Sequence, residues 1–275
     1  MSRSRPASTQ TGRPEATATY VYCVARSARP PDLRLAPPGL PGAGKPRALP
    51  ADGSLWLIVA DAPLARYGER PLARVVRDLD AMARCALAHS AVVAHCARRS
   101  PVLPLRLLTL FSSDARALAQ LTRRRAAISK RLGRVAGQAE WGVQARLQPG
   151  GGPSARRAEA AARRATAALS AGTRFLELRR RQRKATHAVT GGARAAAASL
   201  YRALARHATA GRRRPTVAVD GRPTLLLDAA FLVPAEHAGR FRDAVRAQAA
   251  RGATRGLRVR LTGPWPAYSF VTGRL

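Results

Sequence analysis

Lysine and acidic residues are both scarce in this chain of 275 residues. Lysine occurs only at Lys45, Lys130 and Lys184, so arginine supplies nearly all of the 49 basic residues, which face 15 acidic ones and give a formal net charge of +34. A composition rich in arginine and alanine is typical of GC-rich coding sequence, which replaces lysine by arginine but does not remove aspartate and glutamate. A net charge of this size normally suggests a polyanionic partner, and although the composition bias accounts for the arginines, a real excess of positive charge remains to be explained.

Cysteine is equally sparse, and long apolar runs are missing. Cys23, Cys85 and Cys96 are odd in number and lack a paired spacing, which favours free thiols in a reducing compartment. Residues 1–17 lack the apolar core of a signal peptide, so we expect a disordered tail on a soluble, cytoplasmic protein. The best apolar candidate, residues 102–111, is far shorter than the ~20 residues of a membrane span. We therefore expect no membrane partner.

The first half of the chain alternates between strand-like and helix-like segments. A β-branched and aromatic run at residues 19–25 predicts a strand, and the Pro/Gly-rich residues 29–52 predict a loop. The further predicted elements are a buried strand at 54–60, one helix at 71–98, an edge strand at 102–111 broken by Pro104, and a helix capped by Ser112, Ser113 or Asp114 that ends at Gly133 or Gly137. Residues 18–137 are thus predicted to form an α+β domain.

The second half repeats the alternation in a different order. Its predicted elements are a strand at 140–147, a flexible break at 148–154, a long helical segment at 155–210 with a hinge at Gly191 and Gly192, a strand at 224–233, a helix at 235–251 and a strand at 257–261. This order predicts a ferredoxin-like α+β domain over residues 138–271, with helices on one face of the sheet. Residues 272–275 are expected to be a tail.

Motifs for catalysis, cofactors and metals are missing from the sequence. It has no nucleophile elbow, phosphate loop or clustered carboxylate pair, so we predict no enzyme and no cofactor. Cys85 and His89 are one helical turn apart, but His95 and Cys96 point to other faces of the same helix, so no closed set of metal ligands results. We interpret His89 as a core or boundary residue.

Clusters of arginine are a prominent feature of the sequence. They occur at residues 123–125, 179–183 and 212–214. Charge runs of this kind usually form solvated faces, and the alternative is nucleic-acid binding through charge alone, because no sequence-specific nucleic-acid motif is present. The cluster proposed to face a partner consists of Arg179, Arg180, Arg181, Arg183 and Lys184.

A specific pattern appears toward the end of the chain. Residues 261–271 (LTGPWPAYSFV) carry a strand into Gly-Pro-Trp-Pro, residues 225–233 (LLLDAAFLV) form a leucine-rich strand, and residues 172–176 (GTRFL) precede a basic helix. These segments resemble the gas vesicle protein L/F family, with Phe231 where the family has tyrosine. The matching positions are Gly172, Leu176, Ala230, Phe231, Leu232, Val233, Gly263, Pro264, Trp265, Pro266, Tyr268 and Phe270.

The first half of the chain matches the same family. An opening Tyr-x-Tyr strand, a histidine on the first long helix, a Leu-Pro-x-Arg segment and a Glu-x-Gly strand follow the order of the family. The matching positions are Tyr20, Tyr22, His89, Pro104, Arg106, Thr109, Phe111, Glu140 and Gly142. The sequence departs from the pattern at Leu107 and Leu108, where the family has Phe-Gly, and glycine permits turns or close packing that leucine does not.

The resemblance covers essentially residues 20–271 and implies a non-enzymatic accessory protein. Such a protein binds the hydrophobic major shell protein, together with other gas vesicle accessory proteins, and supports nucleation or assembly of the vesicle in the cytoplasm. We expect a sheet face or edge to shield the shell subunit, and cationic helices to engage acidic partners or the charged face of the subunit. The motif residues are expected to be mainly structural. Trp265 is expected to end a strand and close the core, with direct partner contact as the alternative.

Overall fold

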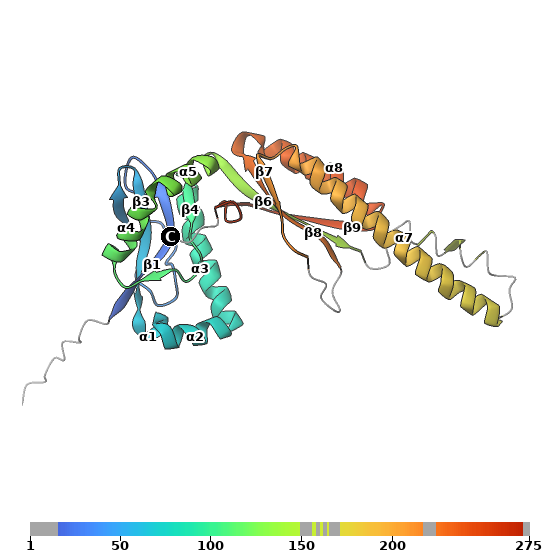
Figure 1. Cartoon of the computed structure of the whole chain (residues 1–275), viewed down its shortest axis with the longest axis horizontal. Coiled ribbons are helices and arrows are strands. Elements are labelled where there is room, and N and C mark those ends of the chain that lie inside the picture. The colour runs from blue at the N-terminus through green and yellow to red at the C-terminus, as the bar shows by residue number, and fades with distance from the viewer. Residues whose placement is uncertain are drawn as a thin grey trace, which may run out of the picture. The chain divides into compact units, whose positions relative to one another are not determined.

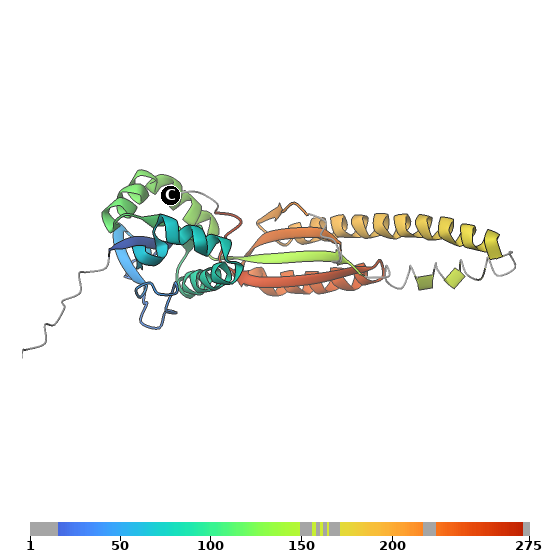
Figure 2. The same ribbon diagram turned by 90° about the horizontal axis from the view of Figure 1, so that it is seen from below.

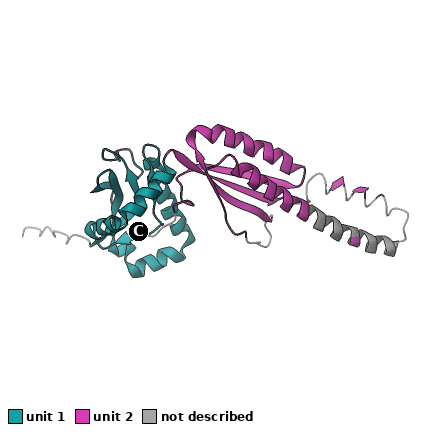
Figure 3. Cartoon of the chain, turned by 45° about the horizontal axis from the view of Figure 1, so that its top comes forward, with its two compact units in different colours: residues 1–136, 272–275 teal, residues 137–271 magenta. Residues whose placement is uncertain are grey.

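The chain contains two compact units, which are described separately (Figure 3). Unit 1 spans Met1–Ala136 with Thr272–Leu275, and unit 2 spans Gly137–Val271. The computed structural model describes residues 16–148, 156, 157, 160, 161, 164, 171–216 and 224–271, and in the long helix of unit 2 it describes side chains at 179, 180 and from 190 onward. The predicted tail at 272–275, nearly all of the one at 1–17 and most of the break at 148–154 lie outside these residues.

Unit 1 is a mixed α and β structure built on one antiparallel sheet (Figure 1). Its elements are β1 (Thr17–Arg26), β2 (Arg47–Asp52), β3 (Leu55–Pro63), α1 (Leu64–Tyr67), α2 (Glu69–Arg77), α3 (Leu79–Ala97), β4 (Val102–Pro104), β5 (Leu110–Phe111), α4 (Asp114–Arg123) and α5 (Arg125–Val135). The sheet order is β2-β3-β1-β4, and β5 also pairs with β1. The middle of β1 is fully buried, as its β-branched and aromatic sequence predicts.

Several predicted elements of unit 1 are divided in the structure. The predicted loop at 29–52 ends in strand β2, which tolerates Pro50 because it lies at the edge of the sheet. The predicted helix at 71–98 breaks at Asp78, whose side chain accepts hydrogen bonds from the backbone N–H groups of Asp80 and Ala81 and so begins a new helix, α3. The predicted strand at 102–111 is two short strands that pair with different parts of β1.

The last helical region of unit 1 is also two helices rather than one. Ser113 is the residue that caps α4, through a hydrogen bond from the backbone N–H of Arg116 at 3.3 Å. The helix ends at Arg123, and α5 begins after Arg124. Of the two glycines considered as stop signals, Gly133 lies inside α5 and Gly137 follows it with a φ of 68°, so Gly137 marks the end.

Unit 2 is a four-stranded antiparallel sheet with helices on one face (Figure 2). Its elements are β6 (Gln138–Leu147), α7 (Ala171–Ala205), β7 (Ala210–Arg213), β8 (Leu225–Pro234), the 3-10 turn η2 (Ala235–His237), α8 (Ala238–Ala253) and β9 (Leu257–Trp265). The sheet order is β7-β8-β6-β9. Strand β7 was not predicted, because its sequence, Ala-Gly-Arg-Arg, has no apolar alternation. The assignment of this half as an independent ferredoxin-like domain stays a prediction.

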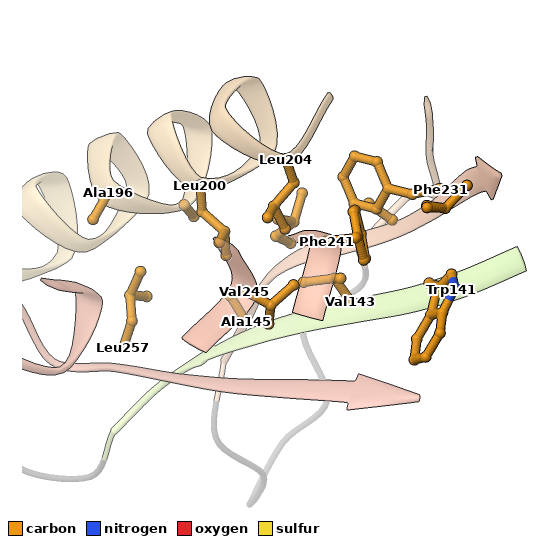
Figure 4. Close-up of a cluster of buried hydrophobic side chains, with 14 of the residues drawn as sticks. Trp141, Val143, Ala145, Ala196, Leu200, Leu204, Phe231, Phe241, Val245 and Leu257 are labelled. Carbon is orange, nitrogen blue, oxygen red and sulfur yellow. The ribbon is translucent and has the colours of Figure 1, made fainter. Parts of the chain in front are cut away.

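The core of unit 2 lies between the sheet and the two helices (Figure 4). Alternate residues of β6, among them Trp141, Val143 and Ala145, point into it, as do Phe231 from β8 and Phe241 from α8. Because successive side chains of a strand point to opposite faces, the residues between them lie on the face that the helices leave open. The helices cover an apolar face of the sheet, and the opposite face is polar along β6, whereas Ala230 and Leu232 of β8 on that face are buried.

Helix α7 passes straight through Gly191 and Gly192, so the predicted hinge between two helices is wrong. Each glycine costs a helix about 1 kcal/mol relative to alanine. The turns that follow offset this cost, because Ala193, Leu200 and Leu204 pack against the sheet in the core. Tertiary packing thus overrides the local preference of the two glycines.

Candidate functional site

Two tyrosines and a histidine from the family pattern form a buried cluster in unit 1. Tyr20 and Tyr22 lie two residues apart on β1, and their rings contact each other edge to face with centroids 4.7 Å apart. The Tyr20 hydroxyl donates a hydrogen bond to Nδ1 of His89 on α3 at 2.6 Å, and the Tyr22 ring stacks on the imidazole with centroids 5.6 Å apart. These motif positions, far apart in sequence, thus join α3 to the sheet.

Burial determines the protonation state of this histidine. It lowers the pKa of His89 to about 4, and a hydrogen bond to the backbone of Leu105 only partly opposes this shift. The imidazole is therefore neutral at pH 7, and its Nδ1 accepts a hydrogen bond from the Tyr20 hydroxyl. A histidine in this state orients the helix and carries no charge.

The second tyrosine holds the Pro/Gly-rich loop. Its hydroxyl accepts a hydrogen bond from the backbone N–H of Leu40 at 3.0 Å, and burial raises the pKa of Tyr22. Gly39, beside this contact, has a φ of 82°, and a Cβ there would lie 2.2 Å from the Tyr22 hydroxyl oxygen. The loop thus approaches Tyr22 more closely than any residue other than glycine allows.

The departure from the family pattern coincides with an unusual backbone conformation. Leu108, at the position where the family has glycine, has a φ of 64°, in the left-handed region. Its backbone N–H donates to the Tyr20 hydroxyl at 3.4 Å, which connects this turn to the tyrosine and histidine cluster. The glycine of the family pattern therefore corresponds to a position that needs a positive φ, and this chain meets the requirement with a leucine.

The neighbouring motif residues build the same turn. Pro104 is paired with Cys23, Phe111 is paired with Thr19, and both pairs attach the segment to β1. The Thr109 hydroxyl donates to the backbone carbonyl of Arg106 at 2.7 Å. These contacts hold the turn in place against β1.

Glu140 organises the motif residues of unit 2. Its side chain is 6% exposed and forms an ion pair with Arg214 at 3.1 Å. It also accepts hydrogen bonds from the backbone N–H and from the hydroxyl of Ser269, each at 2.6 Å. Arg214 in turn forms an ion pair with Asp228 at 3.3 Å. One carboxylate thus holds residues 266–271, which we call the closing segment, against the sheet.

Trp265 does not occupy the predicted place. It was expected to close the core, but it is 50% exposed, and the core tryptophan is Trp141. Strand β9 also continues to Trp265 instead of ending near Leu261, because Trp265 still pairs with Glu140 on β6. The buried residues of the closing segment are Ala267 and Val271.

Gly263 allows the strand to pass close to β6. It has a φ of 119° and precedes Pro264 in a cis peptide bond. A Cβ at Gly263 would lie 2.8 Å from the backbone oxygen of Glu140, so a larger residue would push the two strands apart. The motif glycine is therefore required by close approach of the backbone.

The remaining motif positions of unit 2 include buried residues of β8, half-buried residues such as Gly142, Pro266, Tyr268 and Phe270, and positions of α7 whose side chains are not described. The four from β8 are buried, and Phe231 contacts Phe241 with ring centroids 5.5 Å apart. Gly142 faces Thr262, whose hydroxyl oxygen would lie 2.6 Å from a Cβ there. The side chains of Gly172, Leu176, Arg181, Arg183 and Lys184 lie outside the described residues, and their backbones belong to α7. Arg179 and Arg180 are exposed.

Large aliphatic side chains are exposed on the helices that follow β3. We call Leu64, Val76, Leu79 and Leu87 the aliphatic set; they lie on α1, α2 and α3 and are 42%, 52%, 84% and 73% exposed. Helix α2 buries none of its residues. These exposed aliphatic residues are candidates for contact with an apolar partner.

No metal site is found among the residues that the structure describes, where His, Cys, Asp and Glu nowhere gather in groups of three. The three cysteines are buried and free. None of the described helices is long and apolar enough to cross a membrane.

Comparison with known proteins identifies the family. The profile of the family described as "Gas vesicle synthesis protein GvpL/GvpF" matches residues 18–272, nearly the whole chain. The chain belongs to the GvpL/GvpF family. This is a family of gas vesicle proteins and not a known enzyme family.

Individual members of the GvpL/GvpF family match the chain over more than nine-tenths of its length. The chain is 33% identical over 257 residues to a protein named "Gas vesicle protein L" from a Streptomyces species, and the alignment covers 92% of each chain. Its structure is similar to the crystal structure of GvpF from an Anabaena species, with a TM-score of 0.65, 15% identity, and 94% of this chain and 98% of that chain covered. GvpF from Microcystis aeruginosa gives a TM-score of 0.59, also at 15% identity, with coverage of 93% and 99%. At this level of identity, the two structures show the shared fold.

The burial of neutral His89 predicts that stability depends on pH. Because the folded pKa is about 4 and the unfolded value is 6.5, the unfolded chain binds the proton first as pH falls. The free energy of unfolding is therefore highest above about pH 6.5, and it falls by on the order of 3 kcal/mol as the pH is lowered to 4. Urea unfolding of wild type and His89→Gln across this range should show a shallower pH slope in the variant. His237→Gln, at an exposed position, controls for loss of a histidine. Parallel slopes for wild type and His89→Gln would contradict the assignment.

The left-handed conformation of Leu108 predicts an unusual response to glycine. Leu108→Gly relieves a backbone strain of about 1 to 2 kcal/mol, which offsets the usual entropic cost of glycine. Leu107 is the adjacent residue, is half-buried and does not have a positive φ, so Leu107→Gly adds the entropic cost of glycine without relieving any strain. We expect Leu108→Gly to be the more stable variant by at least ~1 kcal/mol in chemical denaturation. A reversed order would show that the turn does not impose the positive φ.

The hub role of Glu140 predicts a large effect of its removal. Glu140→Ala removes the acceptor of the Ser269 N–H and leaves Arg214 with Asp228 as its one carboxylate partner among the described residues. We expect a loss of about 2 to 3 kcal/mol in the free energy of unfolding, reduced from the value for a fully buried pair because Arg214 is 45% exposed. Asp228→Asn removes only the second carboxylate of Arg214 and should cost less than half as much. Limited proteolysis should release the closing segment earlier in Glu140→Ala. Equal stability of the two variants would remove Glu140 from its central role.

Proposed function

We propose that this protein binds the hydrophobic major shell protein of gas vesicles and supports nucleation or assembly of the vesicle wall. Membership of the GvpL/GvpF family supports a role in gas vesicle synthesis. The observation that carries the more specific proposal is the aliphatic set on α1, α2 and α3. We further propose that the protein acts in the cytoplasm, at the growing vesicle, together with other gas vesicle accessory proteins.

The chemistry of the aliphatic set suits an apolar partner. A shell subunit has to keep its apolar surface covered until it polymerises, and an apolar surface on an accessory protein can cover it. Burying one fully exposed leucine or valine side chain contributes about 1.5 to 3 kcal/mol, so the aliphatic set can supply a substantial part of the affinity for an apolar partner. Leu79 and Leu87, both on α3, are the most exposed of the four and are the main candidates for contact.

This proposal differs from the expectation based on sequence, which was a sheet face or edge. The central strand β1 is buried over Ala18–Ala25, so its side chains are already used inside unit 1. The apolar residues that remain exposed in unit 1 lie on helices and on the loop that carries Leu35. A helical surface is therefore the better candidate.

We propose that the two halves of the chain bind different partners or different parts of one partner. We propose that residues 18–137 and 138–271 fold as separate domains and that the second is ferredoxin-like, because each unit has its own sheet and the second follows the order strand, helix, strand, strand, helix, strand. Arg179 and Arg180, exposed on α7, represent the cationic cluster for which we propose an acidic accessory partner or the charged face of the shell subunit.

Co-purification with the major shell protein tests the proposed function. At moderate salt and after nuclease treatment, wild type should retain the shell protein. Val76→Ser/Leu79→Ser/Leu87→Ser should bind about 100-fold more weakly, because three aliphatic side chains each lose at least about 1 kcal/mol of contact. Leu35→Ser is the control, since it removes an equally exposed leucine from outside the three helices.

A strain lacking the gene and any paralogue provides the second readout. The wild-type gene and Leu35→Ser should restore vesicles, and the triple serine variant should not. Wild-type binding by the triple variant would refute the aliphatic set as the binding surface. Loss of every partner on nuclease treatment would instead favour nucleic-acid binding through charge, and normal vesicle yield without the gene would refute an assembly role altogether.

A further inference from the structure

The open face of the sheet in unit 2 carries a row of arginines that no part of the proposed function uses. Arg146 on β6 lies directly opposite Arg258 on β9, and Gln144 lies directly opposite Arg260. Because residues at every second position of a strand share a face, Arg258 and Arg260 both lie on the face opposite to the helices. We call Arg146, Arg258 and Arg260 the arginine row. Figure 2 views unit 2 from this side, with the strands in front of the helices.

Two arginines of the row face each other across neighbouring strands, because Arg146 lies opposite Arg258. Like charges directly opposite each other on neighbouring strands are destabilising, at a separation of ~5 Å between Cβ atoms. The two carboxylates on the same face, Glu140 and Asp228, are both engaged by Arg214. Arg258 and Arg260 are exposed, and neither forms an ion pair with a carboxylate from the described part of the chain. An external anion would relieve this arrangement.

The edge of the sheet adds a second recognition element beside the row. Strand β9 is the last strand on its side, with β6 as its one neighbour among the described strands. Its outer backbone N–H and C=O groups are therefore a template for one more strand. An extended segment added there would place alternate side chains over the open face, about 7 Å apart, next to Arg258 and Arg260. At the other end of β9, Trp265 lies opposite Glu140 and is half exposed, so it offers an apolar contact to the same segment.

We propose that the outer edge of β9 binds an extended acidic segment of a partner protein, with carboxylates at alternate positions paired to Arg258 and Arg260 and an apolar residue near Trp265. Guanidinium groups recognise carboxylates through paired, charge-assisted hydrogen bonds. Nucleic acid fits less well, because sheets that bind single strands stack bases on several aromatic side chains, and the described part of this surface offers one exposed aromatic residue, Trp265, at the far end of β9. This surface belongs to unit 2 and is separate from the aliphatic set on unit 1.

The binding test uses the full-length protein and a synthetic fluorescent peptide of about ten residues with glutamate at every second position. Anisotropy titration at moderate salt should show that Arg258→Glu/Arg260→Glu weakens binding at least ~10-fold. Arg240→Glu/Arg242→Glu is the matched control. It changes the net charge equally but alters exposed arginines of α8, so binding should stay within about 2-fold of wild type. Arg258→Gln/Arg260→Gln, which removes charge without reversing it, should give an intermediate loss.

Two further arms separate the alternatives. A peptide of the same composition with its glutamates consecutive should bind more weakly than the alternating one, because only alternation places carboxylates on one face of an added strand. Equal loss in both charge-reversed variants, or equal affinity for the two peptides, would reduce the effect to net charge and overturn the proposal. Binding of single-stranded DNA that is tighter than peptide binding and lost in Arg258→Glu/Arg260→Glu would assign the surface to nucleic acid instead. Binding of shell protein in the earlier co-purification should be unaffected by these variants, so the two proposals can fail independently.

Discussion

The scarcity of carboxylates is the constraint on which the described structure depends. With 15 acidic residues against 49 basic ones, the chain uses single carboxylates for several contacts each. Asp114 begins helix α4, accepts a hydrogen bond from Thr19 and forms an ion pair with Arg47, which lowers the pKa of its carboxyl group. Glu140 holds Arg214 and both donors of Ser269. Each unit is thus organised around a carboxylate that connects segments distant in sequence.

The parts of the fold that could be predicted from the sequence are those in which local preference and packing agree. β1, β3 and β8 are apolar, β-branched or aromatic runs, and each is a buried strand near its predicted bounds. Helix α8 begins and ends within a few residues of the prediction. The family pattern named Tyr20 and His89, which are 69 positions apart, but the hydrogen bond that joins them was not predicted.

The parts that could not be predicted depend on contacts between distant segments. The glycine pair in α7 gives a local hinge signal, and only the packing of residues such as Leu200 against the sheet overrides it. Trp265 carries the local signature of a buried indole, yet β9 pairs with β6 up to that residue, and Trp141 fills the core. The exposed aliphatic set was missed because helical periodicity marks Val76, Leu79 and Leu87 as one buried stripe, whereas the break at Asp78 divides the helix and leaves them exposed. The arginine row depends on strand register, which the sequence does not reveal.

The neutral state of His89 has a consequence for how the molecule behaves in the cell. The chain has only five histidines beside a formal charge of +34, and His89, whose pKa burial lowers to about 4, stays neutral as pH falls from about 8 to 6. Guanidinium groups keep their protons throughout this range. The electric field around the protein therefore changes little with pH in this range, whereas the distance over which it acts becomes shorter as the salt concentration rises. A rise in salt concentration therefore weakens the attraction between this protein and an acidic molecule far more than a change of pH within this range does.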